Sequence, residues 1–161
     1  MLRHVTRLLW LVPAAFLFTA ASAQAQVQLN ATLSGGSEAP NRVNTGALGT
    51  AVVFVDTTNL EMTVNVEVFN LPAGATGGHI HVGSTDTAGP VIFDLAPRAG
   101  TTGDFTLSQR LSSANLVVRA AQGIQTMADA IQALTGGNCY INIHTSTNPA
   151  GEIRGQLIRV R

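Results

Sequence analysis

The chain has 161 residues, of which only 11% are charged, and its formal net charge at pH 7 is zero. All nine of its cationic side chains are arginines, because the sequence contains no lysine. This balance gives no electrostatic attraction toward nucleic acid or an anionic membrane surface, so neither is expected as a partner.

Residues 1–25 have the pattern of a secretory signal peptide. Arg3 and Arg7 form a basic start, an apolar run follows over residues 8–20, and small residues ending in an Ala-x-Ala site complete the segment. The apolar run is too short to span a bilayer comfortably. We expect cleavage after Ala25, or alternatively after Ala23, and export to the periplasm or the cell exterior. No membrane span is expected in the remaining single domain, residues 26–161, which has a net charge near −2.

Short alternating runs separated by loops rich in glycine and other turn-forming residues indicate antiparallel β structure. The best hairpin candidate joins residues 48–55 to residues 62–69, where Met62, Val64, Val66 and Val68 share one face. Further strands are predicted at 27–33, 79–82, 90–95 and 105–111.

One segment departs from the β pattern. Residues 113–134 are rich in alanine and glutamine, with apolar residues at helical spacing, and predict one helix or two short ones interrupted near Gly123. Two closing strands follow, at 138–144 and 152–160. The predicted fold class is therefore mainly β, an antiparallel Greek-key-like sandwich or barrel of about eight strands with one helical insertion.

Cys139 is the single cysteine of the chain and cannot form an internal disulfide. It alternates in phase with Ile141 and Ile143. A buried thiol is the expected state.

The three histidines of residues 26–161 all lie in predicted strands. His79 and His81 point to one face of their strand, since alternate residues share a face. His144 belongs to a second strand, with Asn142 on the same face, and Glu152 and Arg154 occupy a third. If these strands are neighbours, the polar side chains converge while the opposite residues form the core.

This convergence has two interpretations. His79, His81 and His144 are suitable ligands for copper or zinc, with Glu152 as a fourth ligand or as an acceptor that orients an imidazole. Alternatively, the polar residues form a solvated face on which Glu152 and Arg154 make an ordinary ion pair and the histidines bond to Asn142, Thr145 or loop carbonyls.

Three stretches of the chain resemble the CHRD domain, a module named for repeated segments of the secreted protein chordin. They are LSGGSEAPNRVNTGALGTAVVFV (33–55), GGHIHVGSTDTAGPVIFDL (77–95) and GNCYINIHTSTNPAGEIRGQL (137–157). The resemblance implies an exported single-domain module without a settled biochemical activity. The growth-factor binding of chordin is credited to separate cysteine-rich modules, which this chain lacks.

A weaker, local likeness concerns residues 78–89, which are similar to the copper-ligand strand of copper/zinc superoxide dismutase. It implies His79 and His81 as a ligand pair, with His144 the candidate third ligand. The other histidines of that enzyme have no counterpart here, and its disulfide is impossible with one cysteine. A dismutase of that type is not expected.

Two functions from different classes follow. The first, which we favour on the sequence, is an exported non-catalytic β-sandwich with a binding or structural role toward a protein of the envelope or the extracellular space. The second is a copper- or zinc-binding protein that uses His79, His81 and His144, with a redox or storage duty. The sequence shows no nucleophile or acid–base constellation, so an enzyme is not expected. It leaves the oligomeric state open.

Overall fold

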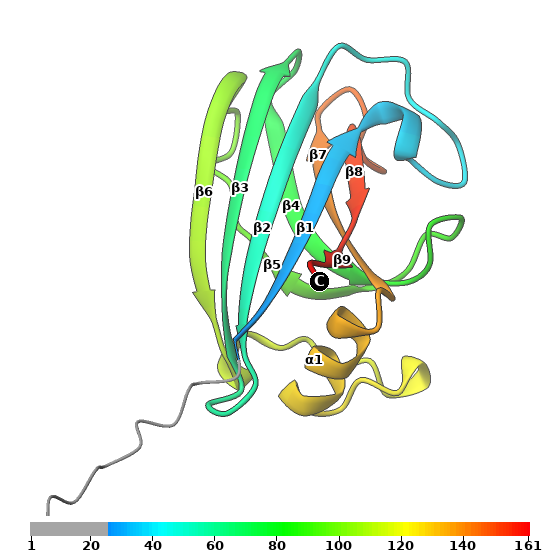
Figure 1. The fold of residues 1–161 in the computed structure, drawn as a ribbon. Coiled ribbons are helices and arrows are strands. Elements are labelled where there is room, and N and C mark those ends of the chain that lie inside the picture. The colour runs from blue at the N-terminus through cyan, green and yellow to red at the C-terminus, as the bar shows by residue number, and fades with distance from the viewer. Residues whose placement is uncertain (1–25) are drawn as a thin grey trace, which may run out of the picture.

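The computed structural model describes residues 26–161, and the predicted signal peptide lies outside the described residues. The described chain forms one antiparallel sheet that curls into a nearly closed barrel (Figure 1). The strands are β1 (Gln26–Ser34), β2 (Leu48–Asp56), β3 (Glu61–Leu71), β4 (Ala75–Val82), β5 (Val91–Asp94), β6 (Gly103–Leu111), β7 (Cys139–Thr145), β8 (Ile153–Gln156) and β9 (Ile158–Arg159). The predicted fold class is thereby confirmed.

The order of the strands in the sheet is β5-β4-β7-β8-β1-β2-β3-β6, with β9 paired to β1. The predicted hairpin is present as β2 and β3, which pair continuously from Leu48–Phe69 to Asp56–Glu61. The two ends of the sheet, β5 and β6, approach each other at a seam, where the Gln109 side chain donates to the carbonyl of Leu95 over 2.8 Å. The strand order makes β4, β7 and β8 immediate neighbours, which is the condition for the three histidines to converge.

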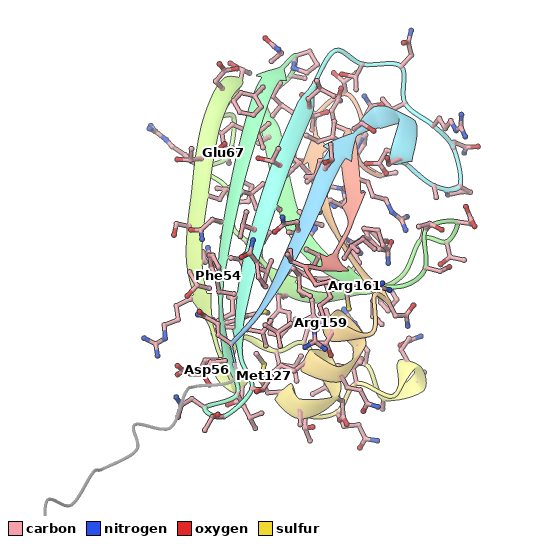
Figure 2. All side chains as sticks on the ribbon, viewed as in Figure 1. Phe54, Asp56, Glu67, Met127, Arg159 and Arg161 are labelled. Carbon is pink, nitrogen blue, oxygen red and sulfur yellow. The ribbon has the colours of Figure 1, made fainter. Side chains whose placement is uncertain are left out.

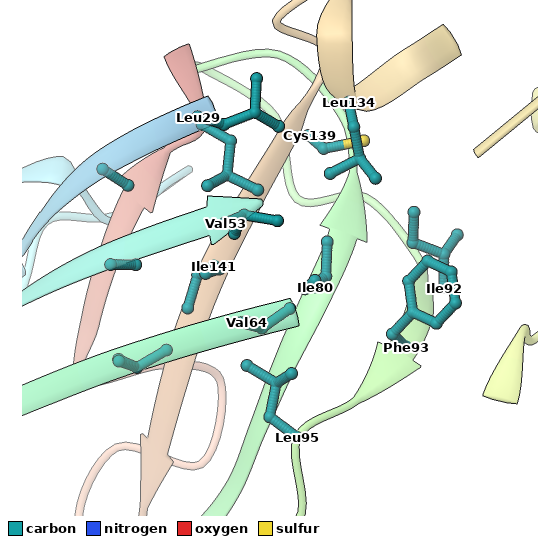
Figure 3. Packing of buried hydrophobic residues seen from close by; sticks show 14 of the residues in the cluster. Leu29, Val53, Val64, Ile80, Ile92, Phe93, Leu95, Leu134, Cys139 and Ile141 are labelled. Atoms are coloured by element: carbon teal, nitrogen blue, oxygen red, sulfur yellow. The ribbon is translucent and has the colours of Figure 1, made fainter. Parts of the chain in front are cut away.

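The interior of the barrel is filled by the apolar half of each alternating strand (Figure 3). Val53, Val64, Ile80 and Ile141 are at most 1% exposed. The prediction that the residues opposite the polar face form the core is confirmed for β4, β7 and β8. Cys139 is completely buried as predicted, and burial raises the pKa of its thiol to about 12. The thiol is therefore protonated and unreactive at neutral pH.

The helical prediction for residues 113–134 is correct only at its end. Residues Ser113–Asn115 and Ala120–Gln122 form single 3-10 turns, and the α-helix α1 spans Met127–Thr135. Tertiary hydrogen bonds explain the difference, because Val117 N–H and Arg119 Nε–H donate to the carbonyls of Ile92 and Val91 and so line the edge of β5. Gly123 adopts a left-handed backbone with φ 75°, which ends the second turn.

Helix α1 begins at a reciprocal cap in which the Thr126 hydroxyl accepts from Asp129 N–H, while the Asp129 carboxylate accepts from Thr126 N–H. The helix packs across one end of the barrel with Met127, Ala130, Ile131 and Leu134 buried (Figure 1). Figure 2 shows Met127 and Asp56 toward this end and Glu67 of β3 toward the other. No helix within residues 26–161 is long and apolar enough to cross a membrane.

Replacing Ile141 with alanine should test the central position of β7 in the core. Ile141 is completely buried, so Ile141→Ala removes packed methyl and methylene groups and should lower the free energy of unfolding by about 2–5 kcal/mol. The matched control is Val118→Ala, at a side chain 53% exposed, which should change it by less than about 0.5 kcal/mol. Urea denaturation followed by circular dichroism measures both values. Equal effects would contradict the described core.

Candidate metal centre

The candidate site is built on the non-core face of β4, β7 and β8. Antiparallel pairing aligns His79 with Asn142 and Arg154 in one row across the three strands. The next row contains His81, Tyr140 and Gln156, and His144 lies opposite Gly77. Because side chains alternate between the faces of a sheet, these polar groups all point to the side opposite Ile80 and Ile141.

The three predicted histidines converge. The ring centroids of His79 and His144 are 4.8 Å apart, those of His79 and His81 5.5 Å, and those of His81 and His144 5.8 Å. One ring nitrogen of each residue lies within 4.8 Å of the corresponding nitrogens of the other two. Among the described residues this is the one group of three or more histidine, cysteine or acidic side chains with such spacing.

The second nitrogen of two of the rings is held by a loop. His81 Nδ1 lies 2.8 Å from the carbonyl oxygen of Gly89, and His144 Nδ1 lies 3.0 Å from that of Pro149. A carbonyl can only accept, so each neutral ring carries its proton on Nδ1 and has a lone pair on Nε2. Both Nε2 atoms are buried and lack a hydrogen-bond partner within the described chain.

His79 uses the opposite nitrogen. Its Nε2 lies 4.0 Å from a carboxylate oxygen of Asp94 on β5, whereas its Nδ1 is buried without a hydrogen-bond partner among residues 26–161. The orphaned nitrogens of the cluster are therefore Nδ1 of His79 and Nε2 of His81 and His144. Buried polar atoms are usually satisfied, so three orphans in one place call for an explanation.

The environment keeps the imidazoles uncharged. Burial lowers the pKa of His81 to about 4, against a smaller opposing effect of its bond to Gly89. Burial is also the main cause of the lowered pKa of His79 and of His144, and a charge on one ring disfavours a charge on its neighbours. Neutral imidazole is the form that binds metal ions.

Tyr140 links the cluster to Arg154. The Tyr140 ring stacks on His81 with centroids 4.8 Å apart and planes 5° apart, and the guanidinium carbon of Arg154 lies 3.4 Å from the tyrosine centroid. The phenol oxygen accepts from Gly89 N–H over 2.9 Å, so Tyr140 braces the same loop residue that holds His81. Arg154 donates to the carbonyls of Thr87 and Ser84, which pins the rest of that loop over the sheet.

Glu38 holds a second loop on this face. Its two carboxylate oxygens each accept from Asn142 Nδ2 over 3.0 Å, and Glu38 and Arg154 both border a polar pocket of ≈ 360 Å³. Gly151 is required at this contact, because a Cβ there would lie 2.7 Å from the Glu38 carboxylate oxygens and its φ is 145°. Burial raises the pKa of Glu38 to about 7.

Glu152 and Arg154 are not the solvated pair of the second interpretation. Each is only 1% exposed, and the ion pairs found in the described chain do not include one between them. The Glu152 carboxylate accepts from Thr145 Oγ1 over 2.8 Å and from Asn148 Nδ2 over 2.6 Å. Glu152 therefore fixes the loop after β7, and it does not belong to the histidine group. The loops on this face keep Glu152 and Arg154 from the solvent.

Sequence reasoning missed Glu38 as a part of the site and gave Tyr140, which it placed on the converging face, no role there. Tyr140 shares the parity of Asn142 and His144, and this signal could have identified it. Glu38 lies in a loop 104 positions from Asn142, and no local pattern predicts that contact.

The fold and the site together define a small β-barrel module with three converging histidines outside its core. Residues 29–157 match the family model of the CHRD domain, and the chain belongs to that family. Neither a curated protein nor a solved structure matches the chain.

Replacing Glu38 with glutamine should change how stability depends on pH. Because the pKa of Glu38 is raised in the folded protein, protonation favours folding, and this contribution is lost as the pH rises through about 7. The free energy of unfolding of the wild type, relative to that of Glu38→Gln, should fall by at least about 1 kcal/mol from about pH 5 to about pH 8. The histidines titrate in both proteins, so their opposite effect on the free energy of unfolding cancels in this difference.

Denaturation curves at several pH values provide the measurement. Glu67→Gln on β3 is the matched control, since Glu67 is exposed and its strand does not adjoin β4, β7 or β8. A difference that is flat across this range would show that Glu38 is charged in the folded protein.

Proposed function

We propose that this CHRD domain is an exported module that binds one copper or zinc ion. The ligands would be His79 through Nδ1 and His81 and His144 through Nε2. The observation that carries the proposal is that three histidine rings converge and that each has one buried nitrogen without a hydrogen-bond partner in the described chain. Imidazole nitrogen is a preferred ligand of both metals.

The contacts behind the rings support the assignment of the ligand atoms. Histidines that bind metals commonly donate their second N–H to a backbone carbonyl or a carboxylate, which fixes the tautomer and the ring orientation. His81 and His144 have carbonyl acceptors in Gly89 and Pro149, and His79 has the Asp94 carboxylate 4.0 Å away. His81 and His144 thus keep the lone pair of Nε2 available for a metal ion.

The spacing of the nitrogens is compatible with one ion after a small adjustment. Metal–nitrogen bonds of about 2.0–2.1 Å place the ligand atoms of one ion roughly 3.3–4 Å apart. The nitrogens lie within 4.8 Å, so shifts of the order of 1 Å are sufficient. The side chains of His79 and His144 are only partly buried, unlike that of His81.

Titration of residues 26–161 with copper(II) and zinc(II) tests the proposal directly. We expect one ion per chain for at least one of these metals. Affinity should fall at least about 100-fold in the His79→Ala/His81→Ala variant and in His144→Ala, because each loses nitrogen ligands. Isothermal titration calorimetry in a weakly chelating buffer measures the affinity.

The matched control for this titration is the wild-type protein in denaturing urea, which contains the same three histidines without their arrangement. Weak binding of similar strength by the folded, unfolded and mutant proteins would contradict the proposal. Circular dichroism of each variant establishes that it is folded.

Gly77 offers a test of the geometry that retains every ligand. A Cβ at this position would lie 2.9 Å from His79 Cε1 and 3.7 Å from His144 Cδ2. Gly77→Ala should therefore displace the His79 ring and weaken metal binding about 10-fold or more, an effect in the range known for residues that orient metal ligands. Thr76→Ala, at the exposed neighbouring position, is the control and should bind like the wild type. Equal affinities would argue against His79 as a ligand.

A binding role toward a protein of the envelope or the extracellular space is the second candidate function. It is favoured by the polar pocket of ≈ 360 Å³ between the loop at residues 36–42 and β8, which is bordered by Arg42, Glu38 and Arg154. If the titrations fail, this pocket becomes the first surface to mutate. Pull-down from the native envelope, with wild type and Arg42→Ala compared, would test it.

A further inference from the structure

We propose that the metal ion held by this cluster takes a small inorganic anion as an exchangeable additional ligand. This inference rests on the proposed metal binding and specifies what the loaded site would recognise. Three features carry it: the number of protein ligands, the charge of the ligand set and the exposure of two of the rings.

The protein supplies three ligand atoms. Copper(II) and zinc(II) bind at least four ligands, and sites with three protein ligands give the remaining position to water or an exogenous group. Within residues 26–161 no cysteine or carboxylate belongs to the histidine group. Glu152 is committed to Thr145 and Asn148, and an Asp94 carboxylate oxygen lies 4.0 Å from Nε2 of His79. With no further histidine, cysteine or carboxylate in the group, we assign the additional position to a ligand from solution.

The charge of the site favours an anion over a neutral ligand. Three neutral imidazoles leave the double positive charge of the ion uncompensated at the ligand atoms. The buried guanidinium of Arg154 adds positive potential, since its carbon lies 3.4 Å from the centroid of the Tyr140 ring that stacks on His81. Asp94 is the acidic group beside the cluster, but its side chain is 65% exposed and solvent screens it.

The cluster is accessible on one side and closed on the other. His81 is 7% exposed and is backed by the Tyr140 ring, so it forms the inner wall. The side chain of His79 is 25% exposed, and His144 is also partly exposed. The exposed parts of these two side chains border the solvent, whereas the three nitrogens without partners are buried. The loops that contact His81 and His144 through the carbonyls of Gly89 and Pro149 lie beside the cluster, which favours a small anion over a bulky organic one.

Azide titration of the copper(II)-loaded protein tests this inference. An azide ion that replaces water on copper(II) produces a ligand-to-metal charge-transfer band in the near ultraviolet and changes the electron paramagnetic resonance spectrum. We expect a saturable change with one azide per copper ion. Dialysis should reverse it and leave copper bound.

The Asp94→Asn variant tests the electrostatic part. Asparagine keeps an oxygen that can accept from Ala96 N–H, as Asp94 does over 2.7 Å, but lacks the negative charge. Azide affinity should rise about two- to fivefold at low ionic strength, and salt should reduce the difference. Glu67→Gln on β3 removes an equal charge away from the site and should leave azide affinity unchanged.

The outcomes separate this inference from the proposed function. Failure to bind copper or zinc would overturn both. Stoichiometric copper with spectra that azide does not alter would overturn the anion site alone, because the remaining position would then be closed or filled by the protein. Azide that strips copper from the chain would also overturn it. Equal azide affinity in Asp94→Asn and wild type would remove the electrostatic argument.

Discussion

The structure depends on one constraint: the outer face of β4, β7 and β8 is polar, yet loops bury it. Polar groups removed from water need partners, and each loop supplies them as it covers the sheet. Arg154 bonds to the carbonyls of Ser84 and Thr87, and Glu38 accepts from Asn142. The loops are thus shaped by the polar side chains beneath them. One ring nitrogen of each histidine in the cluster still lacks a partner in this network, as do Asn142 Oδ1 and Gln156 Oε1.

The same network accounts for the chemistry of the site. Loop carbonyls fix the tautomers of His81 and His144, and burial holds the pKa values of the cluster below that of free histidine. Neutral, oriented rings with buried lone pairs need little reorganisation to bind a metal ion. The Tyr140 ring makes the arrangement more rigid, since it contacts both His81 and Arg154 and also bonds to the loop residue Gly89.

Family membership and site chemistry carry different kinds of information in this protein. The match to the CHRD domain over residues 29–157 establishes what kind of module the chain is. It leaves the molecular activity to be argued from particular residues, because one fold can support unrelated functions. The geometry of His79, His81 and His144 makes metal binding, the second candidate function from the sequence, the first proposal from the structure.

The sequence by itself determined the fold class, the β2–β3 hairpin and the faces of the strands. These follow from the alternation of apolar and polar residues along each strand, which is a local property of the sequence. It also identified the three histidines and the buried state of Cys139. The extent of the helix was decided by tertiary structure, because hydrogen bonds from residues 117–119 to β5 replaced helical ones. Tertiary structure also decided the burial of Glu152 and Arg154 and the contact of Glu38 with Asn142. These depend on contacts between loops and strands that are distant in the sequence, and local sequence patterns do not predict such contacts.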